Sequence, residues 1–92
     1  MIRVLIVDDD PKIRMFFETV LEKMGCETLT AKRISEAKTL SNENDIDIVL
    51  LDLELPDGNG LDIMPDLVNL PSNPEIIIIT GTGDVRGAEI AF

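Results

Sequence analysis

Three segments of the chain are almost continuously apolar and rich in β-branched residues, at positions 2–7, 46–53 and 75–79. Such runs are typical of strands that are buried on both faces of a sheet. A shorter and more polar segment at 27–31 predicts a fourth, weaker strand. The pattern therefore predicts four strands, of which the first, third and fourth lie in the interior of the fold.

The segment between the first two strands has apolar residues at helical spacing. They predict one apolar face of a helix from about Pro11 to Met24, made of Ile13, Phe16, Phe17, Val20, Leu21 and Met24. Asp10 is suited to cap this helix, and Pro11 suits its first position, where a backbone N–H would have no partner. Gly25 is typical of the residue that follows the end of a helix.

Two more helical segments are predicted between the later strands. The first covers about 34–42, and four of its residues are expected to face the core: Ile34, Ala37, Leu40 and Ser41. Residues 54–60 are mostly turn formers and predict a loop. A short helix is expected to follow this loop, with Asp62 as its cap and Pro65 as its third residue, where the missing N–H does no harm.

The last segment begins with Gly81-Thr82-Gly83-Asp84 and predicts a turn into a helix that continues to Phe92. Strands and helices therefore alternate along all 92 residues. This order favours a single α/β domain with a parallel sheet and helices on both of its faces. In such sheets, ligands bind at the C-terminal edge, where the strand order reverses.

The composition narrows the classes of function. Eighteen acidic and eight basic residues give a formal net charge of −10, which disfavours direct binding of nucleic acid by this domain. The chain has no histidine and a single cysteine, Cys26, so an internal disulfide is excluded and a zinc site or a histidine-activated nucleophile is implausible. No apolar run approaches the roughly 20 residues that span a membrane, and we expect a cytoplasmic protein.

Polar residues follow three of the predicted strands. Asp8 and Asp9 come after the first strand, Asp52 ends the third, and Thr80 follows the fourth. The carboxyl ends of parallel strands lie at one edge of the sheet, so we expect these side chains to converge. Crowded carboxylates raise one another's pKa values unless a cation intervenes. Oxygen ligands without His or Cys favour a hard ion, Mg²⁺ over Zn²⁺.

Such a site suits phosphoryl transfer. A Mg²⁺ ion with few protein ligands keeps positions open for water and a phosphoryl group, and it neutralises the charge that develops while a carboxylate attacks in line. Asp52 is the candidate nucleophile, because it stands at the mouth of a core strand. The hydroxyl of Thr80 could donate a hydrogen bond to a phosphoryl oxygen, with Gly81 leaving room beside it. Asp10 is better explained as the helix cap.

Three motifs resemble the receiver domain of bacterial two-component response regulators, and the resemblance covers the whole chain. They lie at 4–10 (Val-Leu-Ile-Val-Asp-Asp-Asp), 49–61 (Val-Leu-Leu-Asp-Leu-Glu-Leu-Pro-Asp-Gly-Asn-Gly-Leu) and 76–81 (Ile-Ile-Ile-Ile-Thr-Gly). The resemblance implies a flavodoxin-like, doubly wound parallel sheet with strand order 2-1-3-4. The sequences at 56–61 and 80–84 are most similar to receivers of enhancer-binding transcription activators.

The resemblance also implies a role for each site residue. Asp52 would accept a phosphoryl group from a phosphohistidine on a sensor histidine kinase and control a downstream output such as transcription. Asp9 and Asp52 would ligate Mg²⁺ together with the backbone carbonyl of Glu54, and Asp8 would act through a metal-bound water. Thr80 would be the switch hydroxyl that moves toward the phosphoryl group. Such a domain is not an enzyme, apart from Mg²⁺-dependent self-phosphorylation and dephosphorylation.

The chain departs from the family pattern at its C-terminal end. Receivers have a fifth strand, which bears a lysine that pairs with the phosphoryl group, and a fifth helix. This chain ends before both, and residues 1–92 are expected to form a C-terminally incomplete receiver domain. Its four lysines lie on or beside the first two predicted helices: Lys12, Lys23, Lys32 and Lys38. Without the fifth strand and its lysine, we expect weak phosphorylation.

The expected absence of the fifth strand and fifth helix would also leave apolar surface uncovered. The strand at 75–79 would be an open apolar edge, through which the chain is expected to form a homodimer or a swapped assembly. Apolar surface beside the first helix is expected to be uncovered as well.

Three other interpretations compete with this one. A haloacid-dehalogenase-type phosphatase also uses a strand-end Asp with Mg²⁺, and Glu54 stands two residues after Asp52, but the Asp-x-Asp-x-Thr/Val pattern is absent and the chain is short. A calcium-binding loop fails because Pro56 occupies its fifth position and the glycine falls one place late. A receiver-fold interaction module that is not phosphorylated in this form stays open as the alternative.

Overall fold

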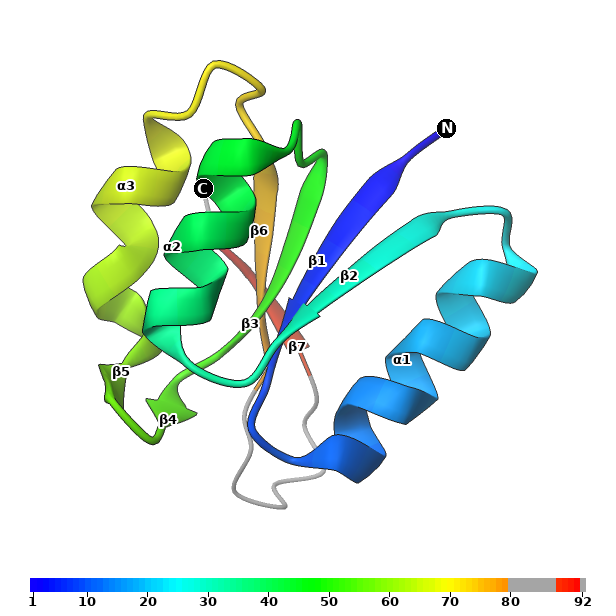
Figure 1. Cartoon of the computed structure of the whole chain (residues 1–92), viewed down its shortest axis with the longest axis horizontal. Helices are drawn as coiled ribbons and strands as arrows, with labels where there is room; N and C mark the ends of the chain where they lie inside the picture. The colour runs from blue at the N-terminus through cyan, green and yellow to red at the C-terminus, as the bar shows by residue number, and fades with distance from the viewer. Residues whose placement is uncertain (80–87, 92) are drawn as a thin grey trace.

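The main sheet has five strands in the order β2-β1-β3-β6-β7, in a computed structural model that describes residues 1–79 and 88–91 (Figure 1). The strands are β1 (Arg3–Val7), β2 (Glu27–Ala31), β3 (Ile48–Asp52), β6 (Glu75–Ile79) and β7 (Ala88–Ala91). The pairings of β1 with β2, of β1 with β3 and of β3 with β6 are all parallel. This arrangement confirms the predicted doubly wound parallel sheet and its strand order.

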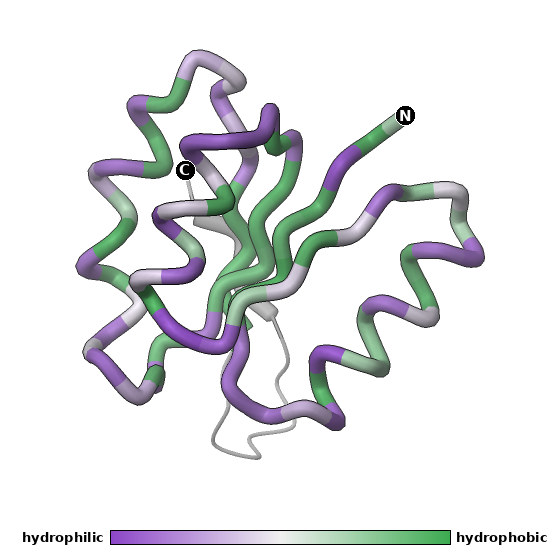
Figure 2. The backbone as a smooth tube through the Cα atoms, in the orientation of Figure 1, coloured by the Kyte–Doolittle hydropathy of each residue, from purple (hydrophilic) through white to green (hydrophobic). Residues whose placement is uncertain are grey.

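Helices cover both faces of the sheet (Figure 1). α1 (Pro11–Lys23) lies on one face, while α2 (Ile34–Glu43) and α3 (Met64–Val68) lie on the other. The core accordingly forms two clusters, one under α1 and one under α2 and α3. Figure 2 shows that hydrophobic residues gather in the central strands, whereas the helices alternate between hydrophobic and polar positions. Within the described ranges, no helix is long and apolar enough to cross a membrane.

Both predicted ends of α1 are confirmed. The side chain of Asp10 accepts a hydrogen bond from the backbone N–H of Lys12 at 2.9 Å and caps the first turn. At the other end, Gly25 has a φ of 88°, a left-handed conformation that glycine adopts without steric cost. Its N–H donates to the carbonyl oxygen of Glu22 at 3.0 Å, which satisfies a group that the end of the helix leaves unpaired.

The predicted apolar face of α1 is only partly buried. Ile13, Phe17 and Leu21 pack against the sheet. The other three predicted positions are exposed, Phe16 by 59% and Met24 by 71%. The predicted apolar face is therefore buried only along one row, and the second row of residues lies along the exposed flank of the helix. The apolar surface expected beside this helix is present.

The helical segment after β3 begins earlier than predicted. It starts with a 3-10 turn, η1 (Gly60–Ile63), that leads into α3. The side chain of Asn59 accepts the backbone N–H of Leu61 at 2.8 Å and caps this turn, so the prediction of Asp62 as the cap is wrong. Asp62 lies inside the turn that Asn59 starts. Pro65 is the second residue of α3 instead of the third.

Residues 88–91 form a strand, β7, instead of part of the predicted helix. β7 pairs with β6 in antiparallel orientation, from Ile79 opposite Ala88 to Ile76 opposite Ala91. The predicted helix is wrong over 88–91, because strand pairing satisfies the backbone groups along the outer edge of β6. That edge is not open, so the prediction of an open apolar edge is wrong, and the expected dimer or swapped assembly loses the surface from which it was predicted. The predicted turn at 81–84 lies outside the described residues.

Candidate functional site

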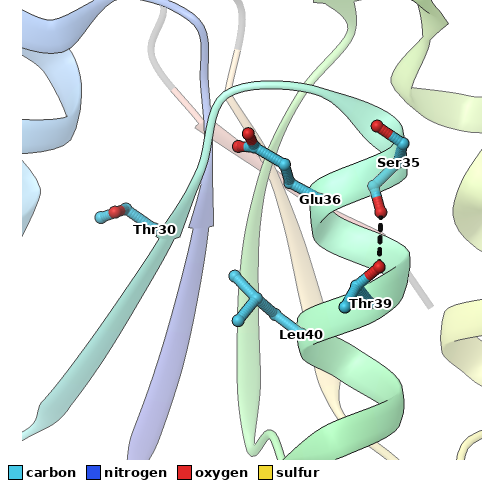
Figure 3. Close-up of a pocket in the computed structure, with 5 residues that line it drawn as sticks. All are labelled: Thr30, Ser35, Glu36, Thr39 and Leu40. Atoms are coloured by element: carbon cyan, nitrogen blue, oxygen red, sulfur yellow. Dashed lines mark hydrogen bonds between the residues drawn. The ribbon is translucent and has the colours of Figure 1, made fainter.

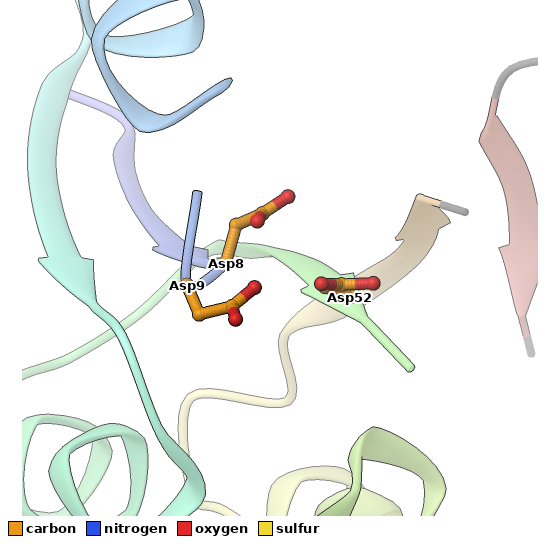
Figure 4. A group of neighbouring side chains, drawn as sticks. All are labelled: Asp8, Asp9 and Asp52. Carbon is orange, nitrogen blue, oxygen red and sulfur yellow. The ribbon is translucent and has the colours of Figure 1, made fainter. Parts of the chain in front are cut away.

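Three carboxylates meet at the C-terminal edge of the parallel strands (Figure 4). Val7 and Leu51 are paired in the register of β1 and β3, so Asp8 and Asp52 stand at adjacent strand ends. Asp9 follows Asp8, and one oxygen from each of the three side chains lies within 4.8 Å of the others. The predicted convergence of these residues is therefore present in the structure.

Two of the three carboxylates are deeply buried. Asp8 and Asp52 are each 2% exposed, whereas Asp9 is exposed. Asp8 accepts a hydrogen bond from the backbone N–H of Asp10 at 2.9 Å, and Asp52 accepts one from that of Glu54 at 3.2 Å. No lysine or arginine within residues 1–79 forms a salt bridge with either of them. Two buried negative charges thus share one site with little compensation.

The electrostatics of the site follow from this burial. Burial, with a smaller contribution from the negative charges of Asp52 and Asp9, raises the pKa of Asp8 to about 6, although the hydrogen bond from the N–H of Asp10 acts in the opposite direction. Burial likewise raises the pKa of Asp52, with the charge of Asp9 adding to the effect. A bound cation would favour the ionised form of both groups.

The donor set fits a hard divalent cation. All three groups are carboxylates, and oxygen ligands of this kind suit Mg²⁺. The buried pair supplies charge that the fold alone does not neutralise, and the exposed Asp9 leaves one side of the site open to solvent. The residues therefore fit the ion that the sequence predicted.

Gly60 determines how closely the loop after β3 approaches Asp52. A Cβ atom at position 60 would collide with the backbone carbonyl oxygen of Asp52 and would touch the side chain of Leu51. The N–H of Gly60 donates to the carbonyl oxygen of Leu53 at 2.8 Å. Only glycine can therefore hold the loop in this position against the strand end.

The same loop is attached to α2 by Asp57. One carboxylate oxygen of Asp57 accepts the backbone N–H of Ile34 at 2.8 Å, and the other accepts that of Ser35 at 3.1 Å. These hydrogen bonds lower the pKa of Asp57, the bond from Ile34 having the largest effect. Sequence reasoning missed this contact, because a helix cap normally comes from the residue just before the helix, and here it comes from 23 positions away.

The remaining predicted site residues have different outcomes. Glu54 has an exposed side chain, and its backbone lies next to Asp52 through the hydrogen bond described above. Thr80 lies outside the described residues. The contact made by Arg14 was also not predicted from the sequence. Its guanidinium donates a hydrogen bond to the backbone carbonyl oxygen of Asp8 at 2.8 Å and stabilises the turn after β1.

A separate hollow of about 410 Å³ lies between β2 and α2 (Figure 3), and it is lined by Thr30, Ser35, Glu36, Thr39 and Leu40. Its polar groups are largely engaged locally. The hydroxyl of Thr39 donates to the carbonyl oxygen of Ser35 at 3.1 Å, and Glu36 accepts the backbone N–H of Lys32 at 3.0 Å. None of the lining residues belongs to the acidic cluster, and we assign no chemistry to this hollow.

Comparison with known proteins places this geometry in a family. The family described as the response regulator receiver domain matches residues 4–92. The response regulator protein PilR of Pseudomonas aeruginosa is 35% identical over 86 residues, which cover 94% of this chain and 19% of PilR. The chain therefore spans about a fifth of the length of this relative.

Solved structures show the same fold. The MaeR response regulator bound to beryllium trifluoride is 38% identical, with a TM-score of 0.79, over 92% of this chain and 71% of MaeR. The beryllofluoride-activated dimer of the NtrC4 receiver domain is 34% identical, with a TM-score of 0.81, over 92% of this chain and 70% of that domain.

Proposed function

The chain belongs to the response regulator receiver domain family, and on this premise we propose that it accepts a phosphoryl group on Asp52. Receiver domains of response regulators are generally non-enzymatic signalling modules that bind Mg²⁺ at an acidic pocket and interact with sensor kinases. The observation that carries the proposal is the cluster of Asp8, Asp9 and Asp52, whose oxygens lie within 4.8 Å of one another.

Each residue of the pocket has a separate role in this proposal. Asp9 and Asp52, with the backbone carbonyl of Glu54, would hold the Mg²⁺ ion, and Asp8 would hold it through a water. The bound ion supplies positive charge against the phosphoryl oxygens. The buried carboxylate of Asp52 attacks the phosphorus, forming an O–P bond as the P–N bond of a phosphohistidine breaks and the imidazole leaves. The hydroxyl of Thr80 would donate a hydrogen bond to the transferred group.

The donor and the output follow from the family. The donor would be a phosphohistidine of a sensor histidine kinase in the cytoplasm, and the output would be control of transcription. A homodimer would use a surface other than the outer edge of β6, which β7 occupies. Among the relatives, KdpE of Escherichia coli is named as a transcriptional regulatory protein, which supports this output.

The proposal is tested by trapping the acceptor. The chain is exposed to acetyl phosphate or beryllofluoride with Mg²⁺, and the adduct is measured by intact mass and by NMR, respectively. We expect an adduct in the wild type and in Asp45→Asn, an exposed acid on another edge, but none in Asp52→Asn. Turnover of a phosphorylated substrate would favour a phosphatase instead. The absence of an adduct in all three proteins would leave the interaction module that is not phosphorylated.

A further inference from the structure

The N-terminus of α2 is capped from a distance. Arg33 occupies the residue before the helix and makes no capping hydrogen bond with its side chain. The first two N–H groups of the helix, those of Ile34 and Ser35, are instead accepted by the two carboxylate oxygens of Asp57. A carboxylate at this end of a helix also interacts favourably with the helix dipole. Asp57 thus forms a two-point connection between α2 and the loop after β3.

Asp57 stands at the tip of a small hairpin that is itself fitted against α2. The hairpin pairs β4 (Glu54–Leu55) with β5 (Gly58–Asn59). Leu55 is buried in the same core cluster as Ile34. A Cβ atom at Gly58 would come within 3.1 Å of the side chain of Ile34, so the backbone there lies close to this side chain. Three neighbouring contacts therefore hold the hairpin on α2.

The base of the same hairpin lies against the acidic cluster. The N–H of Glu54 donates to the carboxylate of Asp52, and Gly60 lies against the backbone carbonyl of Asp52 without room for a side chain. The hairpin is only six residues long from Glu54 to Asn59. Its tip and its base cannot move independently, because β4 and β5 are paired with Glu54 opposite Asn59 and Leu55 opposite Gly58.

We infer that Asp57 is a positioning residue for the metal and phosphoryl site. Its carboxylate does not belong to the acidic cluster, and it acts by holding the hairpin on α2 so that the backbone of Glu54 stays beside Asp52. This inference rests on the proposed function, since it assigns the backbone of Glu54 a part in holding Mg²⁺. It adds a residue whose effect on the site passes through two hydrogen bonds to a helix.

The inference is tested with three variants of the full chain. Asp57→Ala removes both acceptors, and Asp57→Asn keeps one of them. Asp62→Asn removes one negative charge close to the hairpin, and Asp62 accepts no hydrogen bond from α2 within the described residues. Mg²⁺ binding is followed by the change in melting temperature during titration, and acetyl phosphate labelling is followed over the same Mg²⁺ range. Hydrogen exchange at the Glu54 amide reports directly on the loop.

We expect Asp57→Ala to raise the Mg²⁺ midpoint roughly threefold to tenfold, somewhat less than the loss seen when a group bonded directly to a metal ligand is removed. The labelling rate at saturating Mg²⁺ should stay near that of the wild type, and the Glu54 amide should exchange faster. Asp57→Asn should lie between, and Asp62→Asn should match the wild type. A merely structural role would lower the plateau rate and leave the midpoint unchanged.

An unchanged Mg²⁺ midpoint together with an unchanged Glu54 exchange rate in Asp57→Ala would overturn the inference. If that variant melts below the assay temperature, the same comparison is made with Asp57→Asn. If the wild type neither binds Mg²⁺ nor forms an adduct, the proposed function is contradicted, but the inference about Asp57 is not. In that case, the exchange rate at Glu54 still decides whether Asp57 holds the loop.

Discussion

The burial of Asp8 predicts a fold that loses stability as the pH rises. Its folded-state pKa is about 6, against an ordinary value of 3.8. Below the ordinary value the carboxyl is protonated in both the folded and unfolded states. As the pH rises through this window the unfolded chain releases its proton first, so the folded state is progressively disfavoured until the pH exceeds about 6. In the absence of metal, the ionised Asp8 therefore lowers the free energy of unfolding of the wild type at neutral pH.

The size of the cost follows from the shift. A difference of about 2 pKa units corresponds to about 3 kcal/mol, since each unit is worth 1.36 kcal/mol. Asp8→Asn removes this titration, and its amide oxygen can still accept the N–H of Asp10. At pH 7.5, we therefore expect the free energy of unfolding to be about 2–3 kcal/mol higher in the variant than in the wild type. This difference corresponds to a melting temperature on the order of 10 °C higher. At pH 4 the two proteins should nearly coincide.

The assay is urea unfolding in the presence of a chelator, repeated from pH 4 to pH 8. Taking the difference in stability between variant and wild type cancels the titration of acids that do not interact with Asp8, such as Asp57, whose lowered pKa contributes the opposite trend. The exposed Asp45→Asn serves as the control and should show no comparable gain. Added Mg²⁺ should stabilise the wild type more than Asp8→Asn. A stability difference that is the same at pH 4 and pH 7.5 would refute the electrostatic reasoning.

Three other predictions concern the scaffold around the site. Gly60→Ala should cost about 1–3 kcal/mol in urea unfolding, because the added methyl meets the carbonyl of Asp52, and full stability in this variant would contradict the contact. Asp10→Ala should cost about 1 kcal/mol by loss of the α1 cap, measured by thermal unfolding, and a neutral result would count against the cap. Phe16→Ser should change the free energy of unfolding by less than about 0.5 kcal/mol, because this ring is exposed. Phe17→Ala should cost clearly more, because this ring packs against the sheet, and equal losses in the two variants would contradict the difference in burial.

Elements that depend on neighbouring residues could be predicted from the sequence. The continuous apolar runs identify the parallel strands because such strands must be apolar on both faces. Asp10 and Gly25 mark the two ends of α1 because each acts on backbone groups within a few positions. The acidic cluster followed from the same signals, since the ends of adjacent parallel strands bring Asp8 and Asp52 together.

Features that depend on competition between segments could not be predicted in this way. The residues at 88–91 carry no strand signal strong enough to identify them, and their pairing follows from the unpaired edge of β6. The exposure of Phe16 depends on which side of α1 meets the sheet, and helical spacing alone does not determine this. Asn59 and Asp62 are both plausible caps by type, and the position of the turn selected Asn59.

The loop after Asp52 shows why some functional residues escape both kinds of reasoning. Asp57 reads as an ordinary turn residue, because its hydrogen-bond donors lie on a helix that precedes it by more than 20 positions. Gly60 resembles a flexible link in the sequence, yet its lack of a side chain lets the loop lie against the end of β3. Gly60 contacts Asp52 through the backbone, and the inferred effect of Asp57 passes through the backbone of Glu54, so no side-chain pattern reveals either one. The acidic residues supply the chemistry of the site, and the packing of this hairpin between Asp52 and α2 determines the geometry in which they act.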